Sequence, residues 1–210
     1  MNSGKLRAPV ILSLLMLLVP WGSCWAAPFG FDYGMSEEQV IKLLGSDSLM
    51  KVEGDVYYFS KAPKPNEAFE FYALTISPQK GLLKVTAVSK DIDTNVYGDD
   101  LIRQFAEINR PLSKTYGEGE EFDFLKAGSI WSEDKQWMMA LLRGEREFAR
   151  AWEFLVPIDH ITVILLQGKA LSPERGYISL SYEFEGFEQY VAADKEKNPQ
   201  NSSKPKATPD

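Results

Sequence analysis

The segment that decides the fold class lies near the end of the chain and reads Tyr177-Ile178-Ser179-Leu180-Ser181-Tyr182-Glu183-Phe184-Glu185. Large apolar side chains occupy every second position from Ile178 onward, and mostly polar residues stand between them. A period of two predicts a β-strand with one buried and one solvated face, which is typical of antiparallel sheets. We therefore expect an antiparallel sheet to carry the core.

Segments that precede this strand predict further strands. Residues 161–167 form an apolar run. Residues 136–142 and 146–155 flank Gly144, and we expect them to form a hairpin. The alternative is one helix that starts at Ser132, but Gly144 in its interior would cost about 1 kcal/mol relative to Ala.

The first half of the chain contains three more candidate strands, at residues 52–60, 67–77 and 82–92. Pro78 and Gly81 stand at turn-favoured positions between the second and the third, which predicts a hairpin. Both faces of 67–77 are apolar, which predicts a central place in the sheet.

Two helices complete the prediction. Residues 36–44 begin with Ser36 and carry Gln39 three positions later, which is the sequence pattern of a capping box. Residues 99–116 carry one apolar face with helical spacing. We expect the acidic segment 118–123, which follows, to be a loop. The apolar face of the second helix consists of Leu101, Phe105, Ile108, Leu112 and Tyr116.

These elements indicate an α+β fold, with one or more antiparallel sheets and helices packed on one face. Residues 27–191 are expected to form a single domain. Its element order is helix, three strands, helix and four strands, which leaves open two α-then-β units in tandem, with halves 27–95 and 96–191. Residues 192–210 are polar and rich in Pro, Lys, Asn and Ser, and we expect a disordered tail.

Residues 1–26 have the anatomy of a secretory signal peptide, with a basic start, an apolar run at 8–19 and small residues at the end. The apolar run is shorter than the roughly 20 residues of a membrane-spanning helix, so no membrane span is expected in the mature chain. Cleavage between Ala26 and Ala27 predicts a periplasmic protein. The alternative is a membrane-anchored lipoprotein, acylated at Cys24.

Charge and cysteine content narrow the classes of function. Without Lys5 and Arg7 of the signal, 21 basic residues stand against 30 acids and the net charge is -9. Such a chain lacks the basic footprint of a nucleic-acid-binding protein. Its one cysteine, Cys24, lies in the signal, so the mature chain has no disulfide, no thiol nucleophile and no cysteine-ligated zinc.

The helix start also carries a family resemblance. The stretch Gly34-Met35-Ser36-Glu37-Glu38-Gln39-Val40-Ile41-Lys42-Leu43-Leu44-Gly45 resembles the first helix of BamE-type (SmpA/OmlA) outer-membrane assembly lipoproteins and of the β-lactamase-inhibitor-protein fold. In both, helices pack on an antiparallel sheet, and the inhibitor fold is a tandem of two α-then-β units. Ser46 replaces the Pro that often follows Leu-Gly. The resemblance implies a non-catalytic interaction module and assigns no functional residue.

Residues for catalysis are few. His160 is the only histidine, and its neighbour Asp159 would point to the other face of a strand. We predict no catalytic residue, no metal site and no cofactor. We interpret the chain as an exported non-catalytic interaction protein, an envelope accessory factor or an inhibitor-like binder, with a protein partner. The alternatives are a carboxylate-dependent hydrolase and a binder of a small ligand between helix and sheet.

Aromatic residues near acidic ones are the candidates for an interaction surface. Tyr177 lies on the polar face of the last strand, and Phe187 and Tyr190 follow that strand. Trp131 lies in a polar segment after the second helix. Exposed aromatic side chains of this kind are enriched at protein interfaces.

Overall fold

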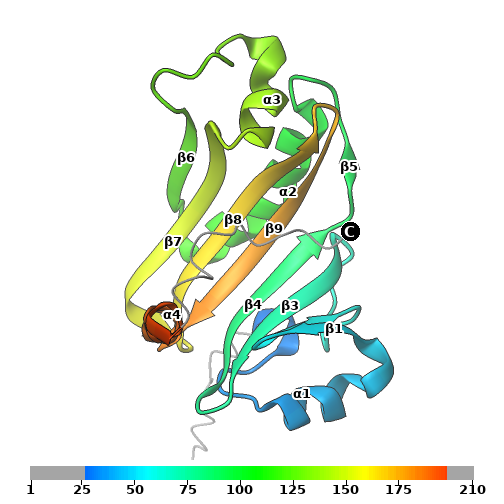
Figure 1. Cartoon of the computed structure of the whole chain (residues 1–210), viewed down its shortest axis with the longest axis vertical. Helices are drawn as coiled ribbons and strands as arrows, with labels where there is room; N and C mark the ends of the chain where they lie inside the picture. Colours follow the sequence, from blue (N-terminus) through cyan, green and yellow to red (C-terminus); the bar gives the residue numbers. More distant parts are fainter. Residues whose placement is uncertain (1–26, 198–210) are drawn as a thin grey trace, which may run out of the picture.

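Strand β9 (Arg175–Phe184) runs through the middle of the sheet, between β4 (Gly81–Ser89) and β8 (Ile161–Ser172) (Figure 1). The computed structural model describes residues 27–197. The predicted apolar positions of this strand are buried, but Ser181 on the opposite face is buried as well, so that face is not solvated along its whole length.

Several predictions for the ends of the chain fall outside the described residues. They are the signal peptide, cleavage after Ala26, acylation at Cys24 and the tail beyond Lys197.

All strands of the described chain belong to one antiparallel sheet, in the order β1-β2-β3-β4-β9-β8-β7-β6. Each half of the chain contributes four consecutive neighbours to this order, and the halves join where β4 pairs with β9. The α+β fold is therefore confirmed, and each half contributes a four-stranded run to the sheet. The remaining strands are β1 (Leu49–Glu53), β2 (Val56–Phe59), β3 (Phe69–Ser77), β5 (Ile92–Asp93, paired with β9), β6 (Glu120–Leu125) and β7 (Arg146–Ile158).

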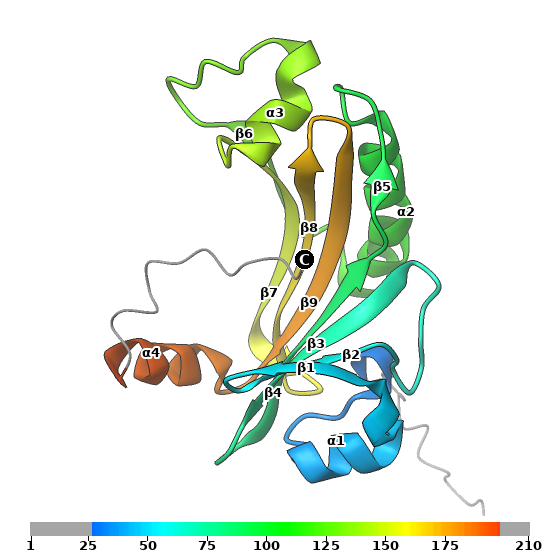
Figure 2. The same ribbon diagram turned by 45° about the vertical axis from the view of Figure 1, so that its right-hand side comes forward.

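Helices α1 (Glu37–Leu44) and α2 (Asp99–Tyr116) pack on the same face of the sheet. The Tyr57 hydroxyl of β2 donates to Glu37 of α1 at 2.8 Å. The strand register places Tyr57 in one row with Tyr182 of β9, and Tyr182 lies beside Leu112 of α2. Figure 2 shows the two helices at opposite ends of the sheet, and buried side chains from both halves form one core.

The capping box of α1 is confirmed. The Gln39 amide nitrogen donates to the Ser36 hydroxyl at 3.3 Å, and the Ser36 amide nitrogen donates to the Gln39 side chain at 2.8 Å. Gly45 ends the helix with φ of 81°, and a short 3₁₀ turn, η2 (Ser46–Ser48), leads into β1.

The hairpin predicted around Gly144 is wrong in its first arm. The chain instead forms a 3₁₀ turn, η3 (Asp134–Gln136), and helix α3 (Trp137–Leu142), and only the second arm is a strand, β7. Gly144 is not inside the helix but follows it, with φ of 66°, so it ends the helix without the interior penalty. Helix α3 has apolar residues on every side, and two of them, Met138 and Ala140, are fully buried.

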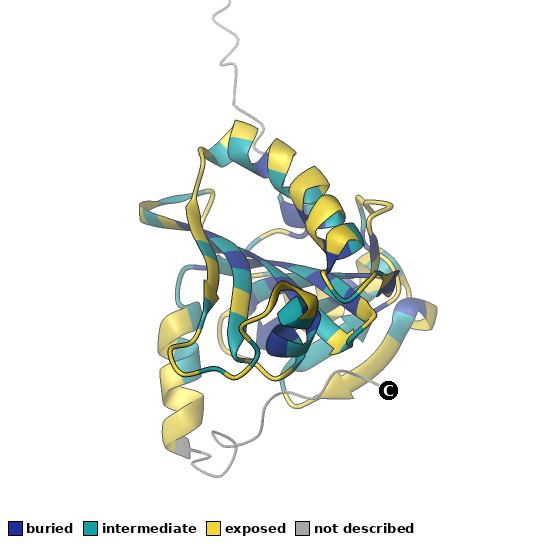
Figure 3. Cartoon of the chain, turned by 90° about the horizontal axis from the view of Figure 1, so that it is seen from above, coloured by how far each residue is buried: buried dark blue, intermediate teal, exposed yellow. Residues whose placement is uncertain are grey.

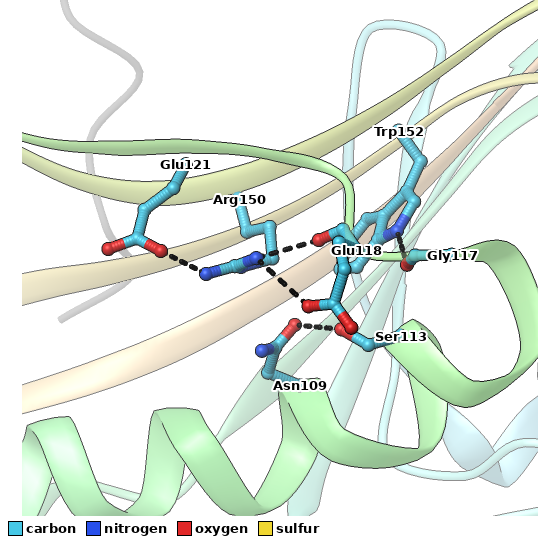
Figure 4. Close-up of polar contacts among 7 residues, drawn as sticks. All are labelled: Asn109, Ser113, Gly117, Glu118, Glu121, Arg150 and Trp152. Carbon is cyan, nitrogen blue, oxygen red and sulfur yellow. Dashed lines mark hydrogen bonds and ion pairs between the residues drawn. The ribbon is translucent and has the colours of Figure 1, made fainter.

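The segment 118–123 is a loop only at its first two residues, because β6 begins at Glu120 and pairs with β7 at the edge of the sheet. Arginines of β7 compensate its acids: Arg150 forms an ion pair with Glu121, and Arg146 forms one with Asp123. Arg150 also donates to the Glu118 carbonyl oxygen at 2.7 Å, next to the hydrogen bond from Trp152 to Gly117 (Figure 4).

The strand predicted at 52–60 is in fact a hairpin of β1 and β2. The chain turns at Gly54, which has φ of 58°, and the pairing of Glu53 with Val56 closes the turn. The residues before and after Gly54 both have the pattern of a strand, so the sequence pattern does not reveal the turn between them.

The tail predicted from residue 192 begins as helix, because α4 (Phe187–Lys197) extends through it. Figure 3 shows that α4 is mostly exposed. Its sequence therefore has no apolar face from which a helix could be predicted. Its first turns are attached by the Tyr190 hydroxyl, which donates to Asp55 at 2.8 Å, and by Phe187, 4.9 Å from the Lys84 ammonium. No helix in residues 27–197 has the length and apolar character needed to cross a membrane.

Candidate functional site: a groove beside α2 and the β7–β8 tip

A groove of about 730 Å³ lies between α2 and the segment before α1. Ile108, Leu112 and Tyr116 of α2 form one wall, and Phe29 and Phe69 form the other. Phe29 belongs to a 3₁₀ turn, η1 (Pro28–Gly30), and Phe69 begins β3. Strand β9 forms the floor of the groove. Four segments that are far apart in sequence therefore meet around it.

The neighbours of Phe29 hold it in a strained backbone conformation. Its φ is 54°, in the left-handed region, which costs a non-glycine residue of order 1–3 kcal/mol. The Phe29 carbonyl oxygen accepts from the Lys64 amide nitrogen at 2.9 Å, and this bond ties the segment to the loop before β3. The ring then lies edge-on against Phe69, at 5.4 Å, and against Tyr182, at 6.0 Å between centroids.

The floor of the groove is formed by Leu180 and Tyr182 of β9. Burial, and to a lesser degree the nearby Tyr116, raises the pKa of the Tyr182 phenol well above its usual range. Burial likewise raises the pKa of Tyr116. Both phenols therefore stay neutral at physiological pH, and the aromatic lining contributes no charge.

Glu107 of α2 is the only charged side chain in the lining of the groove as the structure describes it. It takes part in none of the ion pairs of the described chain. Glycoside chemistry usually requires two carboxyl groups that flank the bond to be cleaved. The lining of this groove, as the structure describes it, offers one carboxyl group. Residues 27–197 do not bring three or more His, Cys, Asp or Glu side chains together as a metal site.

The second region is the β7–β8 tip, which comprises residues 154–160. Between Glu153 and Ile158, β7 carries extra residues that its partner β8 does not match, so the chain bulges outward. Leu155 and Val156 lie in this bulge and are 105% and 81% exposed. Two adjacent apolar side chains thus project fully into solvent.

The tip is anchored at its base. Asp159 and His160 form a tight turn with φ of 48° and 66°, and both are held in the left-handed region. The His160 ring stacks on Tyr33 at 4.5 Å and pairs with Glu185, and the His160 carbonyl oxygen accepts from the Glu185 amide nitrogen at 2.9 Å. His160 therefore serves here as a contact between the tip, β9 and the segment before α1.

The predicted surface residues do not form one surface. Phe187 and Tyr190 lie together on α4, with ring centroids 6.4 Å apart. Tyr177 pairs with Lys169 toward the opposite end of β9, and Trp131 lies in the loop between β6 and η3, where its amide nitrogen donates to Ser129. All four are half-buried.

The sequence did not predict which residues form the groove and the β7–β8 tip. The groove residues of α2, β3 and β9 had been placed only on predicted apolar faces and Phe29 had been given no role, because nothing local shows that four distant segments meet. A signal for the tip was present, since Leu155-Val156-Pro157 is an apolar run that ends in a strand-breaking proline. The predicted strand ended at Leu155, and Val156 and Pro157 were given no role.

The chain was compared with protein-family models, with curated proteins and with solved structures. None of the three comparisons found a match, so the resemblance to BamE-type lipoproteins and to the β-lactamase-inhibitor-protein fold stays a hypothesis.

Proposed function

We propose that this chain is an exported, non-catalytic interaction protein of the bacterial envelope, and that the β7–β8 tip is its contact surface for a protein partner. The observation that carries the proposal is the exposure of two adjacent apolar residues, Leu155 at 105% and Val156 at 81%. Burying an apolar side chain of this size against a partner is worth about 1.5–3 kcal/mol. The tip thus offers binding energy that the folded chain itself does not use.

The anchoring of the tip supports the same function. A mobile loop loses conformational entropy when it binds, at about 0.5–1.5 kcal/mol for each side chain that becomes ordered. The turn at Asp159 and His160 and the stacking on Tyr33 already restrict the base of the tip before a partner arrives. A pre-organised projection of this kind fits an apolar pocket on another protein.

Charge narrows the chemistry of that partner. Glu153 precedes the tip, Asp159 lies within it, and Glu185 pairs with His160 at its base. A partner pocket with an apolar centre and basic residues at its rim is complementary to this arrangement. The negative net charge of the whole chain also favours a partner with basic residues.

A differential pull-down from envelope extract tests the proposal. The tagged processed chain is compared with the double variant Leu155→Asp/Val156→Asp and with Met50→Asp, which changes an exposed apolar residue at the opposite edge strand β1. We expect the wild-type chain and Met50→Asp to retain the same partner and the double variant to lose it. Equal capture by all three proteins would refute the assignment of the tip.

Export has its own test. The intact mass of the protein recovered from the cell envelope should correspond to a chain that starts at Ala27. A diacylglyceryl-modified N-terminus at Cys24 would instead place the protein on a membrane as a lipoprotein. A retained signal sequence, with the protein in the cytoplasm, would contradict the envelope function.

A further inference from the structure

The groove beside α2 has a chemical character that the proposed protein contact leaves unexplained. Its walls and floor hold four aromatic rings, from Phe29, Phe69, Tyr116 and Tyr182. The Phe29 ring meets Phe69 at an interplanar angle of 79° and Tyr182 at 84°. In both contacts the rings pack edge to face against each other, and all four rings contribute to the lining of the groove.

A groove lined by aromatic rings favours cations over neutral ligands. The faces of aromatic rings are negative, so they attract a cation that lies within about 6 Å of the ring centre. Several rings around one ammonium group are a recurrent means of recognising alkylated ammonium ions. Neutral apolar groups enter the same space, but they gain only the burial of surface.

The charged group in the lining is negative, like the faces of the aromatic rings, and so also favours a cation. Glu107 is the only charged side chain that lines the groove in the described chain, and it has no ion-pair partner there. The raised pKa values of Tyr116 and Tyr182 keep both phenols protonated, so they neither add charge nor repel an anion by ionising. An anionic ligand would find no cationic partner in this lining.

We infer that the groove binds an organic cation, a small molecule with an alkylated ammonium group attached to an apolar body. The ammonium group lies among the aromatic rings on the side of Glu107, and the apolar body lies along Ile108 and Leu112 of α2. The volume of about 730 Å³ falls within the range of small-molecule sites.

The strain at Phe29 is consistent with a binding role. A left-handed conformation at a non-glycine residue persists only when its surroundings hold it, and such residues cluster at ligand-binding sites. Here the strained backbone places the Phe29 ring against Phe69 and Tyr182, where it forms part of the aromatic lining of the groove.

Three probes of equal shape test the inference: choline, its neutral isostere 3,3-dimethylbutan-1-ol and the anion 3,3-dimethylbutanoate. Binding to the processed chain is followed by NMR chemical-shift titration, with resonances of Phe29, Leu112 and Tyr182 as reporters. We expect choline to bind about ten-fold more tightly than the neutral isostere, which corresponds to a cation–π gain at a partly desolvated site. The anion should bind more weakly than both.

A charge variant with a matched control completes the test. Glu107→Gln should weaken choline binding roughly two- to five-fold, the size of a partly exposed charge interaction, and leave the neutral isostere unchanged. Glu38→Gln changes an exposed acid on α1, away from the groove, and should alter neither. The inference is overturned if the neutral isostere binds as tightly as choline, or if Glu107→Gln behaves like Glu38→Gln. Neither result bears on the β7–β8 tip, whose test uses different variants and a different readout.

Discussion

The groove beside α2 and the β7–β8 tip both expose apolar side chains, but they are built in opposite ways. The groove is recessed and draws its residues from η1, the start of β3, α2 and β9. The tip projects, and its exposed residues are adjacent in one bulge of β7. Since the groove residues also belong to the core, changes there alter folding as well as binding. The tip can change its contacts at little cost to the fold.

The largest effect on stability is expected at Phe29, in the wall of the groove. Phe29→Ala removes a ring that contacts Phe69, Tyr72 and Tyr182 and should cost about 3 kcal/mol in the free energy of unfolding. Phe29→Gly removes the same ring but relieves the left-handed backbone, and should be about 1 kcal/mol more stable than Phe29→Ala. Urea denaturation of both variants measures the difference.

A loss below about 1 kcal/mol for Phe29→Ala would show that the ring adds little to packing. Equal stabilities of the two variants would mean that the strain at this residue is not real. Either result would remove the structural distinction between the groove and the tip.

The next largest effect is expected at Arg150 of β7, whose side chain contacts the link between α2 and β6. Its side chain is only 14% exposed, but its partners Glu118 and Glu121 are 89% and 63% exposed. Those partners regain water when the arginine is removed, so Arg150→Ala should cost about 1–2 kcal/mol rather than the 3–5 of a fully buried pair. Arg103→Ala breaks an exposed ion pair on α2 and should cost less than about 0.5 kcal/mol.

Thermal or urea unfolding of Arg150→Ala and Arg103→Ala distinguishes the two cases. If the variants lose equal stability, the contact in Figure 4 is an ordinary surface ion pair and does not hold β6 to the sheet.

A smaller effect, on pH dependence, is expected at Tyr182 on the groove floor. Its pKa is raised in the folded chain relative to about 10 in the unfolded chain, so the neutral form favours folding. This stabilisation is complete below about pH 10 and is lost as pH rises toward the folded-state value. Tyr182→Phe should therefore flatten the fall in stability above pH 10, relative to wild type.

Urea denaturation at pH 8, 10 and 11 provides the measurement, and Tyr97→Phe, at a largely exposed position, is the control. An unchanged slope in Tyr182→Phe would show that the phenol is not desolvated in the groove.

The smallest effect on stability is expected at the tip. Leu155→Asp/Val156→Asp should change the free energy of unfolding by less than about 0.5 kcal/mol, because neither side chain is packed in the folded chain. A loss above about 1 kcal/mol would mean that the two side chains pack against the protein, and the tip would no longer be a free contact surface.

The fold class and the elements with one clear period were predictable from sequence. Periodicity located β9 and α2, and the capping pattern of Ser36 and Gln39 located α1. Helix α3 was missed because a glycine after a helix and a glycine between two strands look alike in sequence. Strand β6 was missed because its acids favour a loop until arginines from a distant segment neutralise them.

Of the candidate sites, only residue types were predictable. Phe187 and Tyr190 do lie together, but Tyr177 and Trp131 lie elsewhere. The groove depends on Phe29 meeting Tyr182, which is more than 150 residues away in sequence and joins it only after both halves fold. The exposure of the tip depends on a register shift between β7 and β8 that leaves no mark in the periodicity.

Local pattern therefore decided which segments became the capped helix α1, the amphipathic helix α2 and the alternating strand β9. These features depend on residues a few positions apart, whose contacts form within one element. Tertiary structure alone decided that β6 is an edge strand, that Phe29 is strained into the groove and that Leu155 projects from the tip. In each case the balance of charge, strain or burial involves partners distant in sequence, and only the assembled sheet brings them into contact.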